Sequence, residues 1–467
     1  MQADVPRLVI AATVSGGGKT TVTCGLLRAL QRRGLHPRAC KCGPDYIDPL
    51  FHERVIGVPS HNLDLFMSGR DDVRRLVAEG AATAARRPAD VTVIEGVMGY
   101  YDGIAVSDQA STWDVARTTE SLAILVLDGH GRARSLAAEA KGFATLRNPS
   151  QIGAVILNRV SRDMYPRLKA LIEEETGLPV LGHVPQLDDI ELESRHLGLV
   201  GADEVADLQG RLDRLAGVME QTGDLEAVLA LAKTAPALTV APRELEPVTD
   251  RPVRIAIARD LAFCFYYADG LRPLEALGAE LVPFSPLADD DLPADVDGLY
   301  LGGGYPELHA AALEANAALR ARIRHEVAAG LPTVAECGGF MYLQQAIEDA
   351  EGVPHELVGF LPGRAFKTDC LRRFGYVTLT AQEDGLLANK GQTLRAHEFH
   401  YWESDETGAA FHAQKPQSAR AWDCCVTTPT LYAGYPHINF YSEPVAARRF
   451  VEACVRHRVA RLGGDGR

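Results

Sequence analysis

A lysine and a threonine follow three glycines near the start of the chain, in Thr13-Val-Ser-Gly-Gly-Gly-Lys-Thr20. The segment holds the parts of a phosphate-binding loop: Gly16, Gly17 and Gly18 to turn backbone N–H groups toward a phosphate, Lys19 for positive charge, and Thr20 for a hydroxyl ligand to Mg²⁺. A predicted strand precedes it and a predicted helix follows, whose N-terminus favours anions. The strict pattern has glycine where this chain has Thr13, so a glycine-rich turn with an incidental lysine is the alternative.

Carboxylates lie at the end of one predicted strand and just past another. Asp45 and Asp48 lie in Lys41-Cys-Gly-Pro-Asp-Tyr-Ile-Asp-Pro49, and Glu95 ends the apolar run VTVIE. Magnesium prefers oxygen ligands, usually including one or two carboxylates. We therefore expect the Asp45–Asp48 loop to face the terminal phosphate and to hold metal or substrate; a simple polar turn is the alternative.

A second chemistry is centred on Cys337, in Val334-Ala-Glu-Cys-Gly-Gly339. The small residues after it permit a sharp strand-to-helix turn, and a helix N-terminus is expected to lower the thiol pKa and favour the thiolate. A nucleophilic thiol also needs a base, and His437 in Gly-Tyr-Pro-His-Ile-Asn is the preferred one. His397 and His400 are rivals.

Two glycine-containing turns could supply the backbone amides of an oxyanion hole. Gly303 and Gly304 belong to Leu-Gly-Gly-Gly-Tyr-Pro-Glu, directly after a predicted strand, and Gly338 follows the cysteine. Together these N–H groups could stabilise a tetrahedral oxyanion. A plain glycine turn is the alternative.

Alternating strand and helix signals position these residues. The predicted strands are short apolar runs typical of parallel strands covered on both faces, at 7–13, 91–94, 122–127, 152–157, 254–258, 280–284, 298–301 and 333–335. The first helix is predicted over Lys19–Arg33, with Gly34 placed to end it. Residues 237–252 are rich in proline and read as a linker. The sequence therefore predicts two α/β domains: a doubly wound parallel-sheet domain at 1–240, a linker at 241–252 and a second domain at 253–467.

Composition narrows the class of protein. The 467 residues carry 48 Lys+Arg against 62 Asp+Glu, a net charge of −14, which argues against general binding to nucleic acid or anionic membrane. No run approaches the roughly 18 apolar residues of a membrane-spanning helix, and the first residues read as a strand, not a signal peptide. The nine cysteines form no disulfide or zinc framework. We expect reduced thiols and a cytoplasmic enzyme.

The motifs taken together resemble one family across nearly the whole chain. They are SGGGKTT, KCGPDYIDPLFH, VIEGVMGYYDG, DLAFCFYY, LGGGYPE, AECGGFMYL, HEFHYWE and YPHINF. They resemble the cobyrinic acid (equally, hydrogenobyrinic acid) a,c-diamide synthases of cobalamin biosynthesis. The first domain also resembles dethiobiotin synthetase, and the second a flavodoxin-like class I glutamine amidotransferase. The KCGPDYIDP loop argues against the sister family, cobyric acid synthase.

The resemblance implies an ATP- and Mg²⁺-dependent ligase that amidates a corrinoid polycarboxylate with ammonia from L-glutamine, through an acyl phosphate. In the first domain, the resemblance implies that ATP is bound by Lys19, Thr20 and the second phosphate lysine Lys41, and that Asn158 contacts the adenine ring. It implies that the metal is held by Thr20, Asp45 and Glu95, and that Asp48 positions the substrate or the intermediate. In the second domain, it implies that Cys337 is the nucleophile and His437 the base. A homodimer is a family expectation.

One position departs from the amidotransferase pattern. Asn439 stands two residues after His437, where an orienting carboxylate is usual, so we predict a Cys–His dyad with Asn439 as a weak orienter. An acidic chain must also bind a polyanion, and the basic cluster Arg364, Lys367, Arg372 and Arg373 is one candidate for that role. The sequence leaves two other functions open: a nickel sirohydrochlorin a,c-diamide synthase, and a P-loop regulatory ATPase with an inert amidotransferase-like domain.

Overall fold

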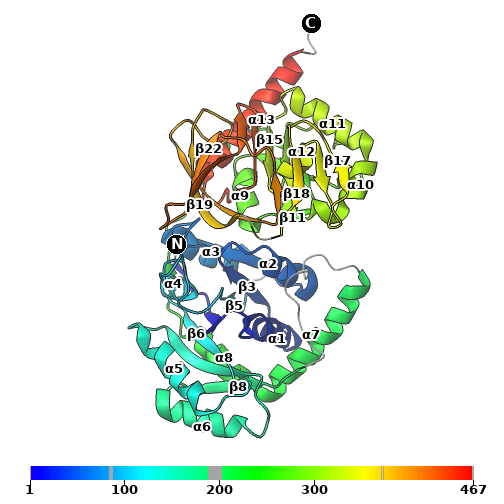
Figure 1. Ribbon diagram of the computed structural model, residues 1–467. Coiled ribbons are helices and arrows are strands. Elements are labelled where there is room, and N and C mark those ends of the chain that lie inside the picture. The colour runs from blue at the N-terminus through cyan, green and yellow to red at the C-terminus, as the bar shows by residue number, and fades with distance from the viewer. Residues whose placement is uncertain (1, 84–87, 188–201, 370, 372, 465–467) are drawn as a thin grey trace. The chain divides into compact units, whose positions relative to one another are not determined.

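A computed structural model describes residues 2–83, 88–187, 202–369, 371 and 373–464. Its contacts divide the chain into two compact units, Met1–Arg243 and Glu244–Arg467, each with its own sheets and core (Figure 1). None of the helices in the described part of the chain is long and apolar enough to span a membrane.

The first unit is built on a seven-stranded, all-parallel sheet. In spatial order its strands are β4 (Ser60–Leu63), β3 (Pro37–Cys42), β5 (Val91–Glu95), β2 (Arg7–Ala12), β6 (Leu122–Asp128), β7 (Ile152–Asn158) and β8 (Val180–Val184). Every residue of β2, β3 and β5 is buried, as expected for strands covered on both faces. The prediction of a doubly wound parallel-sheet domain is therefore confirmed.

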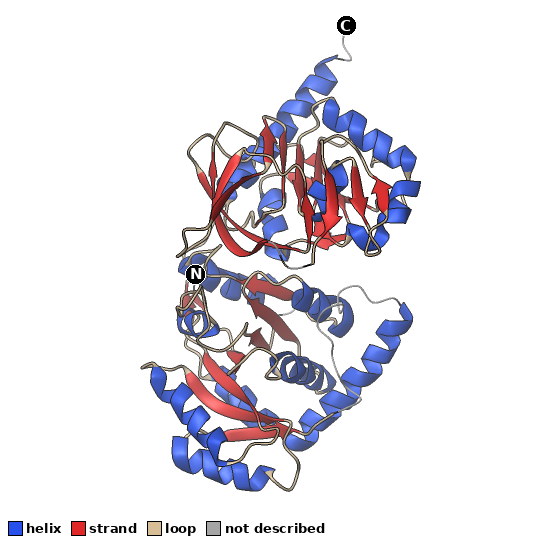
Figure 2. Cartoon of the chain, viewed as in Figure 1, coloured by secondary structure: helices blue, strands red, loops and turns tan. Residues whose placement is uncertain are grey.

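Helices connect these strands and cover the sheet (Figure 2). They are α1 (Lys19–Arg32), α2 (Ile47–Phe51), the π-helix η1 (His52–Ile56), α3 (Arg70–Thr83), α4 (Thr112–Thr118), α5 (Arg134–Leu146), α6 (Tyr165–Thr176), α7 (Ala202–Thr222) and α8 (Leu225–Lys233). Gly34 follows α1 with a φ of 76°, the left-handed conformation expected after a helix end. Leucines of α1 and α7 pack into one core with strands β2, β3 and β5.

The proline-rich segment after α8 is not only a connector. Within it, β9 (Leu238–Thr239) pairs antiparallel with β1 (Gln2–Ala3). This pairing joins residues more than 200 positions apart, so no local pattern could reveal it.

The second unit contains a six-stranded sheet whose central strands are parallel. Its order is β12 (Ala279–Phe284), β10 (Val253–Ala258), β13 (Gly298–Leu301), β15 (Thr333–Glu336), β25 (Leu431–Gly434) and the antiparallel β24 (Val426–Thr428). The helices of this unit are α9 (Ala268–Ala276), the 3₁₀ helix η2 (Pro306–His309), α10 (Ala310–Ala315), α11 (Ala317–Ala328), α12 (Gly338–Leu343) and α13 (Pro444–Gly464).

The expected alternation of strands and helices does not continue through residues 346–438. This stretch forms strands. Several of them build an antiparallel five-stranded sheet, and burial of its apolar face in the core of the unit stabilises it. Its order is β23 (Ala421–Cys424), β22 (Phe411–Gln414), β19 (Arg373–Ala381), β20 (Thr393–His400) and β26 (His437–Ile438). The smaller sheets hold β17 (Pro354–Glu356), β16 (Ala346–Glu348), β18 (Arg364–Lys367) and β21 (Trp402–Ser404), and β11 (Phe263–Phe265) with β14 (Gly303–Gly304).

Candidate functional site

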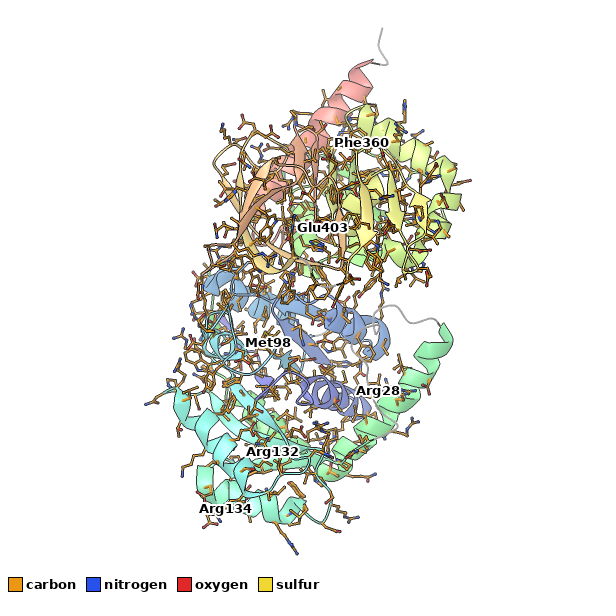
Figure 3. All side chains as sticks on the ribbon, viewed as in Figure 1. Arg28, Met98, Arg132, Arg134, Phe360 and Glu403 are labelled. Carbon is orange, nitrogen blue, oxygen red and sulfur yellow. The ribbon has the colours of Figure 1, made fainter. Side chains whose placement is uncertain are left out.

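The glycine-rich segment connects β2 to α1 and closes around Lys19. Gly18 has a φ of 101°, a conformation that a residue with a Cβ disfavours, and a Cβ there would lie 2.0 Å from the amide nitrogen of Asn158. Lys19 is buried, and its Nζ donates to the carbonyls of Val14 at 3.2 Å and Met98 at 2.5 Å. Figure 3 labels Met98 in this unit. The loop therefore supplies both fixed amides and a positive charge.

Three neighbouring strands bring opposite charges together beneath this loop. Glu95 ends β5, where the register pairs it with Ile10 of β2 on one side and Lys41 of β3 on the other. The Lys41 Nζ donates to Glu95 Oε1 at 2.9 Å and forms a close ion pair with Asp48. The Thr20 hydroxyl donates to the same Glu95 oxygen at 2.7 Å. Lys41 thus links two buried carboxylates.

His52 belongs to this cluster, although the sequence analysis did not single it out. Its Nε2 lies 3.2 Å from Glu95 Oε2, its Nδ1 lies 3.0 Å from the Ser60 hydroxyl, and the ring is fully buried. A carboxylate held by such a partner keeps a fixed orientation. His52 is the last residue of the KCGPDYIDPLFH motif, and that position was the one indication of its role in the sequence.

Burial and ion pairing move the pKa values of this cluster in different directions. Burial, with the charge of Lys41 next, lowers the pKa of Lys19 to about 8. Burial also raises the pKa of Asp48 to about 7, although Lys41 opposes the shift. Burial alone would raise the pKa of Glu95, but the charge of Lys41 and the close approach of His52 hold it well below its ordinary value. The cluster therefore keeps one firmly ionised carboxylate, Glu95.

Asp45 and Asn158 make contacts that differ from their expected roles. The Asp45 Oδ1 accepts hydrogen bonds from the backbone N–H groups of Ile47 at 2.8 Å and Asp48 at 3.2 Å, and so caps the start of α2. The Asn158 Nδ2 donates to the Gly17 carbonyl at 3.2 Å. Their roles as metal ligand and adenine-binding residue stay predictions.

A cavity of about 690 Å³ opens over the loop. The predicted nucleotide and metal groups that line it are Gly16, Gly18, Lys19, Thr20, Lys41, Asp45, Asp48 and Asn158. Glu95 and Gly17 are not among the described residues that line it, and Glu95 lies fully buried. The lining fits a nucleoside triphosphate with Mg²⁺, because it offers amides and two lysines for phosphates and a hydroxyl with two carboxylates for the cation.

Glu95 fits an indirect role better than direct ligation. It holds the Thr20 hydroxyl and Lys41 from behind the cavity wall. Within the described ranges, no three Cys, His, Asp or Glu side chains form a ready metal-binding group. Glu95 as a metal ligand stays a prediction.

In the second unit, Cys337 occupies a strained turn between β15 and α12. Its φ of 48° and ψ of −101° are rare for a residue with a side chain. The Gly338 N–H at the start of the helix lowers the pKa of the Cys337 thiol, as expected, but burial, followed by the charge of Glu307, outweighs it and raises this pKa well above its ordinary value. A nucleophile held as the neutral thiol depends on a base.

The imidazole of His437 lies against the glycine turn. A Cβ on Gly303 would lie 2.4 Å from His437 Cε1 and 3.2 Å from its Nε2, and a Cβ on Gly338 would lie 3.1 Å from the backbone nitrogen of Gly304. The three glycines therefore gather beside the cysteine turn and the histidine. Their oxyanion-hole role stays a prediction, and the close approach explains why side chains are absent at these positions.

A carboxylate approaches His437 from a direction that the sequence spacing did not suggest. The Glu336 Oε2 lies 3.7 Å from His437 Nδ1, and both side chains are buried. Asn439 instead accepts the backbone N–H of Tyr441 through its Oδ1 at 3.0 Å. The interpretation of Asn439 as orienter therefore finds no support in its hydrogen bond, which caps a turn.

The rival histidines are held by packing. His397 pairs directly across from His437 in the β20–β26 register, and burial, together with His437, lowers the pKa of His397 to about 3. His400 stacks on Tyr435 with ring centroids 3.8 Å apart, and its Nδ1 lies 2.7 Å from the Trp402 carbonyl oxygen.

The predicted basic cluster does not form a set of equally available cations. Arg364 and Lys367 are exposed on β18. Arg373 is half-buried, and its Nε lies 3.5 Å from a carboxylate oxygen of Glu403, which Figure 3 labels. Arg372 lies outside the described residues. A role for this cluster in binding a polyanion stays a prediction.

Two known protein families match this chain, one over each of the two parts that carry a candidate site. Residues 8–200 match the CobQ/CobB/MinD/ParA nucleotide binding domain. Residues 254–445 match the CobB/CobQ-like glutamine amidotransferase domain. The cavity lies in the first matched segment, and both Cys337 and His437 lie in the second.

Curated relatives match over almost the whole length. A cobyrinate a,c-diamide synthase of Salmonella typhimurium is 40% identical, covering 98% of this chain and 100% of the relative. One from Thermoplasma volcanium is 39% identical, covering 97% and 98%. One from Caldanaerobacter subterraneus is 37% identical, covering 96% and 98%.

Proposed function

This chain belongs to the cobyrinate a,c-diamide synthase family, and from that premise we propose how its two units share the reaction. The family is one of ATP-dependent carbon–nitrogen ligases with a glutamine amidotransferase domain. We propose that the substrate is cobyrinic or hydrogenobyrinic acid, and that the a and c acetate side chains become amides.

The chemistry explains why two units are required. A carboxylate does not condense with ammonia in water, because hydroxide is a poor leaving group. In the proposed first step, a carboxylate oxygen of the substrate attacks the γ-phosphorus of ATP, which gives an acyl phosphate and ADP. Ammonia then attacks the acyl carbon, phosphate leaves, and the nitrogen loses a proton. Each of the two amidations consumes one ATP and one glutamine.

The first unit carries the phosphoryl transfer in this proposal. Lys19 and Lys41 stabilise charge on the phosphates, and the loop amides hold them in place. Thr20, with Asp45 and Asp48, would hold Mg²⁺, which neutralises phosphate charge when bound. Glu95 fixes Thr20 and Lys41 from behind. Asp48 also faces the cavity, where it positions the substrate or the acyl phosphate.

The second unit supplies ammonia from glutamine. The raised pKa of Cys337 means that His437 must take the thiol proton as the sulfur attacks the glutamine amide carbon. The backbone amides of Gly304 and Gly338 stabilise the oxyanion. The imidazolium then gives its proton to the departing nitrogen, and water hydrolyses the thioester to glutamate.

The observation that carries this proposal is the presence of both sites in one chain: a phosphate-binding cavity with two lysines, and a strained cysteine turn with a histidine beside a glycine turn. A regulatory ATPase would need only the phosphate-binding cavity.

The test is a mass-resolved assay with ATP, Mg²⁺ and glutamine. Cobyrinic acid, hydrogenobyrinic acid and nickel sirohydrochlorin are supplied separately to the purified protein. Two amidations of a corrin support the proposal. Amidation of the nickel compound alone would keep the mechanism and replace the substrate. ATP hydrolysis with no amide product on any of the three would favour a regulatory ATPase.

A further inference from the structure

Glu336, the residue immediately before the nucleophile, holds the turn and the histidine strand together. It ends β15 and is 2% exposed. Its Oε1 accepts the backbone N–H of Ile438 at 2.9 Å, and its Oε2 accepts the Tyr300 hydroxyl at 3.1 Å. The same Oε2 lies 3.7 Å from His437 Nδ1. In both hydrogen bonds a Glu336 carboxylate oxygen is the acceptor.

We propose that Glu336 is the positioning carboxylate of the glutaminase site and replaces the acid that is absent two residues after His437. This inference rests on the proposed function of the second unit. Glu336 holds the proton of the neutral imidazole on Nδ1, so that the unprotonated Nε2, on the side of the glycine turn, can accept the thiol proton. It also stabilises the imidazolium that forms when the thiol proton moves to Nε2.

The orientation of the ring supports this assignment. Nδ1 faces Glu336, whereas Cε1 and Nε2 lie toward Gly303. A distance of 3.7 Å is longer than a hydrogen bond, and catalytic hydrogen bonds in free enzymes are often long and shorten when substrate binds. The hydrogen bond from Ile438, the next residue after the histidine, fixes the carboxylate to the strand that carries the ring.

Other groups near the ring are less suited to this role. Asn439 carries no charge, and its Oδ1 accepts the Tyr441 N–H. His397 lies directly across from His437, but its lowered pKa keeps it neutral. Glu398 follows His397 on β20, so strand alternation directs it to the opposite face of the sheet.

The proton and electron balance gives Glu336 an electrostatic role only. The thiol proton moves to His437 Nε2, the Cys337 sulfur forms a bond to the amide carbon, and the carbon–nitrogen bond breaks as the nitrogen takes that proton. Glu336 neither gains nor loses a proton. Its charge matters only while the imidazole is positive.

The test is Glu336→Gln, which keeps the side-chain volume and an oxygen for the Ile438 N–H but removes the charge. Glu443→Gln is the matched control, because Glu443 is a half-buried carboxylate of the same unit that also accepts a backbone N–H, from Arg395 at 3.0 Å. Glutamate release is measured for both variants and the wild type, alongside amidation driven by ammonium chloride.

We expect Glu336→Gln to lower the glutaminase kcat by about 100- to 1,000-fold, with the KM for glutamine and the ammonium-driven rate each within threefold of wild type. Glu443→Gln should stay within threefold in all three. A glutaminase kcat within threefold of wild type for Glu336→Gln overturns the inference, and so does an equal loss in Glu443→Gln. Absence of glutaminase in the wild type would instead refute the proposed function.

If Glu336→Gln does not fold, Glu336→Asp decides the question. This variant keeps the negative charge, but its side chain is one methylene shorter, so the carboxylate lies farther from His437 Nδ1. We expect a loss of at least about tenfold in kcat with KM unchanged, and an unchanged kcat overturns the inference.

Discussion

Gly303→Ala tests whether the histidine ring occupies the place that the structure gives it. The added Cβ would lie 2.4 Å from His437 Cε1, whereas carbon atoms in ordinary contact are about 3.5–4.0 Å apart. The ring or the β14 backbone must therefore move by about 1 Å. The ring is 1% exposed, so it has little free space in which to move.

A displacement of about 1 Å at a reacting group costs on the order of 100-fold in rate, or about 2.7 kcal/mol of transition-state stabilisation. Gly303 lacks the positive φ that would add backbone strain. We therefore expect the glutaminase kcat to fall about 100-fold, while amidation driven by ammonium chloride stays within twofold of the wild-type rate.

Gly463→Ala in α13 is the matched control, because a Cβ there meets open space. Glutamate release and ammonium-driven amide formation are measured on both variants. A folded Gly303→Ala protein with a glutaminase kcat within threefold of wild type would refute the reasoning, because the ring would then not stand where catalysis needs it.

Three further predictions concern the buried charges. Lys41→Met leaves Asp48 and Glu95 buried without their cation, so the first unit should lose about 3–5 kcal/mol of unfolding free energy in urea; a loss under about 1 kcal/mol contradicts this. Thr20→Val removes the hydroxyl that donates to Glu95 and should raise the Mg²⁺ concentration for half-maximal ATPase activity about tenfold, whereas Thr20→Ser should not. Burial raises the pKa of Glu307 from 4.5 to about 7, so wild-type stability should fall relative to Glu307→Gln by about 3 kcal/mol as pH rises from about 4.5 to 7. Parallel pH profiles of unfolding for wild type and Glu307→Gln would show that Glu307 is solvated.

The sequence predicted the first unit well because its signals are local. Continuous apolar runs give buried parallel strands, and the glycines and Lys19 sit between one such run and an amphipathic helix. The antiparallel sheet of the second unit was missed. Its pairs β19–β20 and β22–β23 join consecutive strands, but the strand that carries His437, β26, pairs with β20 about forty residues earlier.

The site shows the same division between local and distant causes. The strained turn at Cys337 follows from its small neighbours, but the pKa of the thiol depends on burial and on Glu307, thirty residues earlier in the chain. Spacing alone directed attention to Asn439. The carboxylate that approaches His437 comes from Glu336, about a hundred residues away, and the pairing of β15 with β25, which sets Glu336 across from Gly434, brings the two together.

The division of labour between the two units is tested most directly with Cys337→Ala. The variant is given ATP, Mg²⁺ and the corrin substrate with either glutamine or ammonium chloride, and amidation is followed by mass. We predict two amidations with ammonium chloride at close to the wild-type rate, and no amidation with glutamine. Amidation with glutamine at the wild-type rate, or none with ammonium chloride while the wild type is active, would contradict the account.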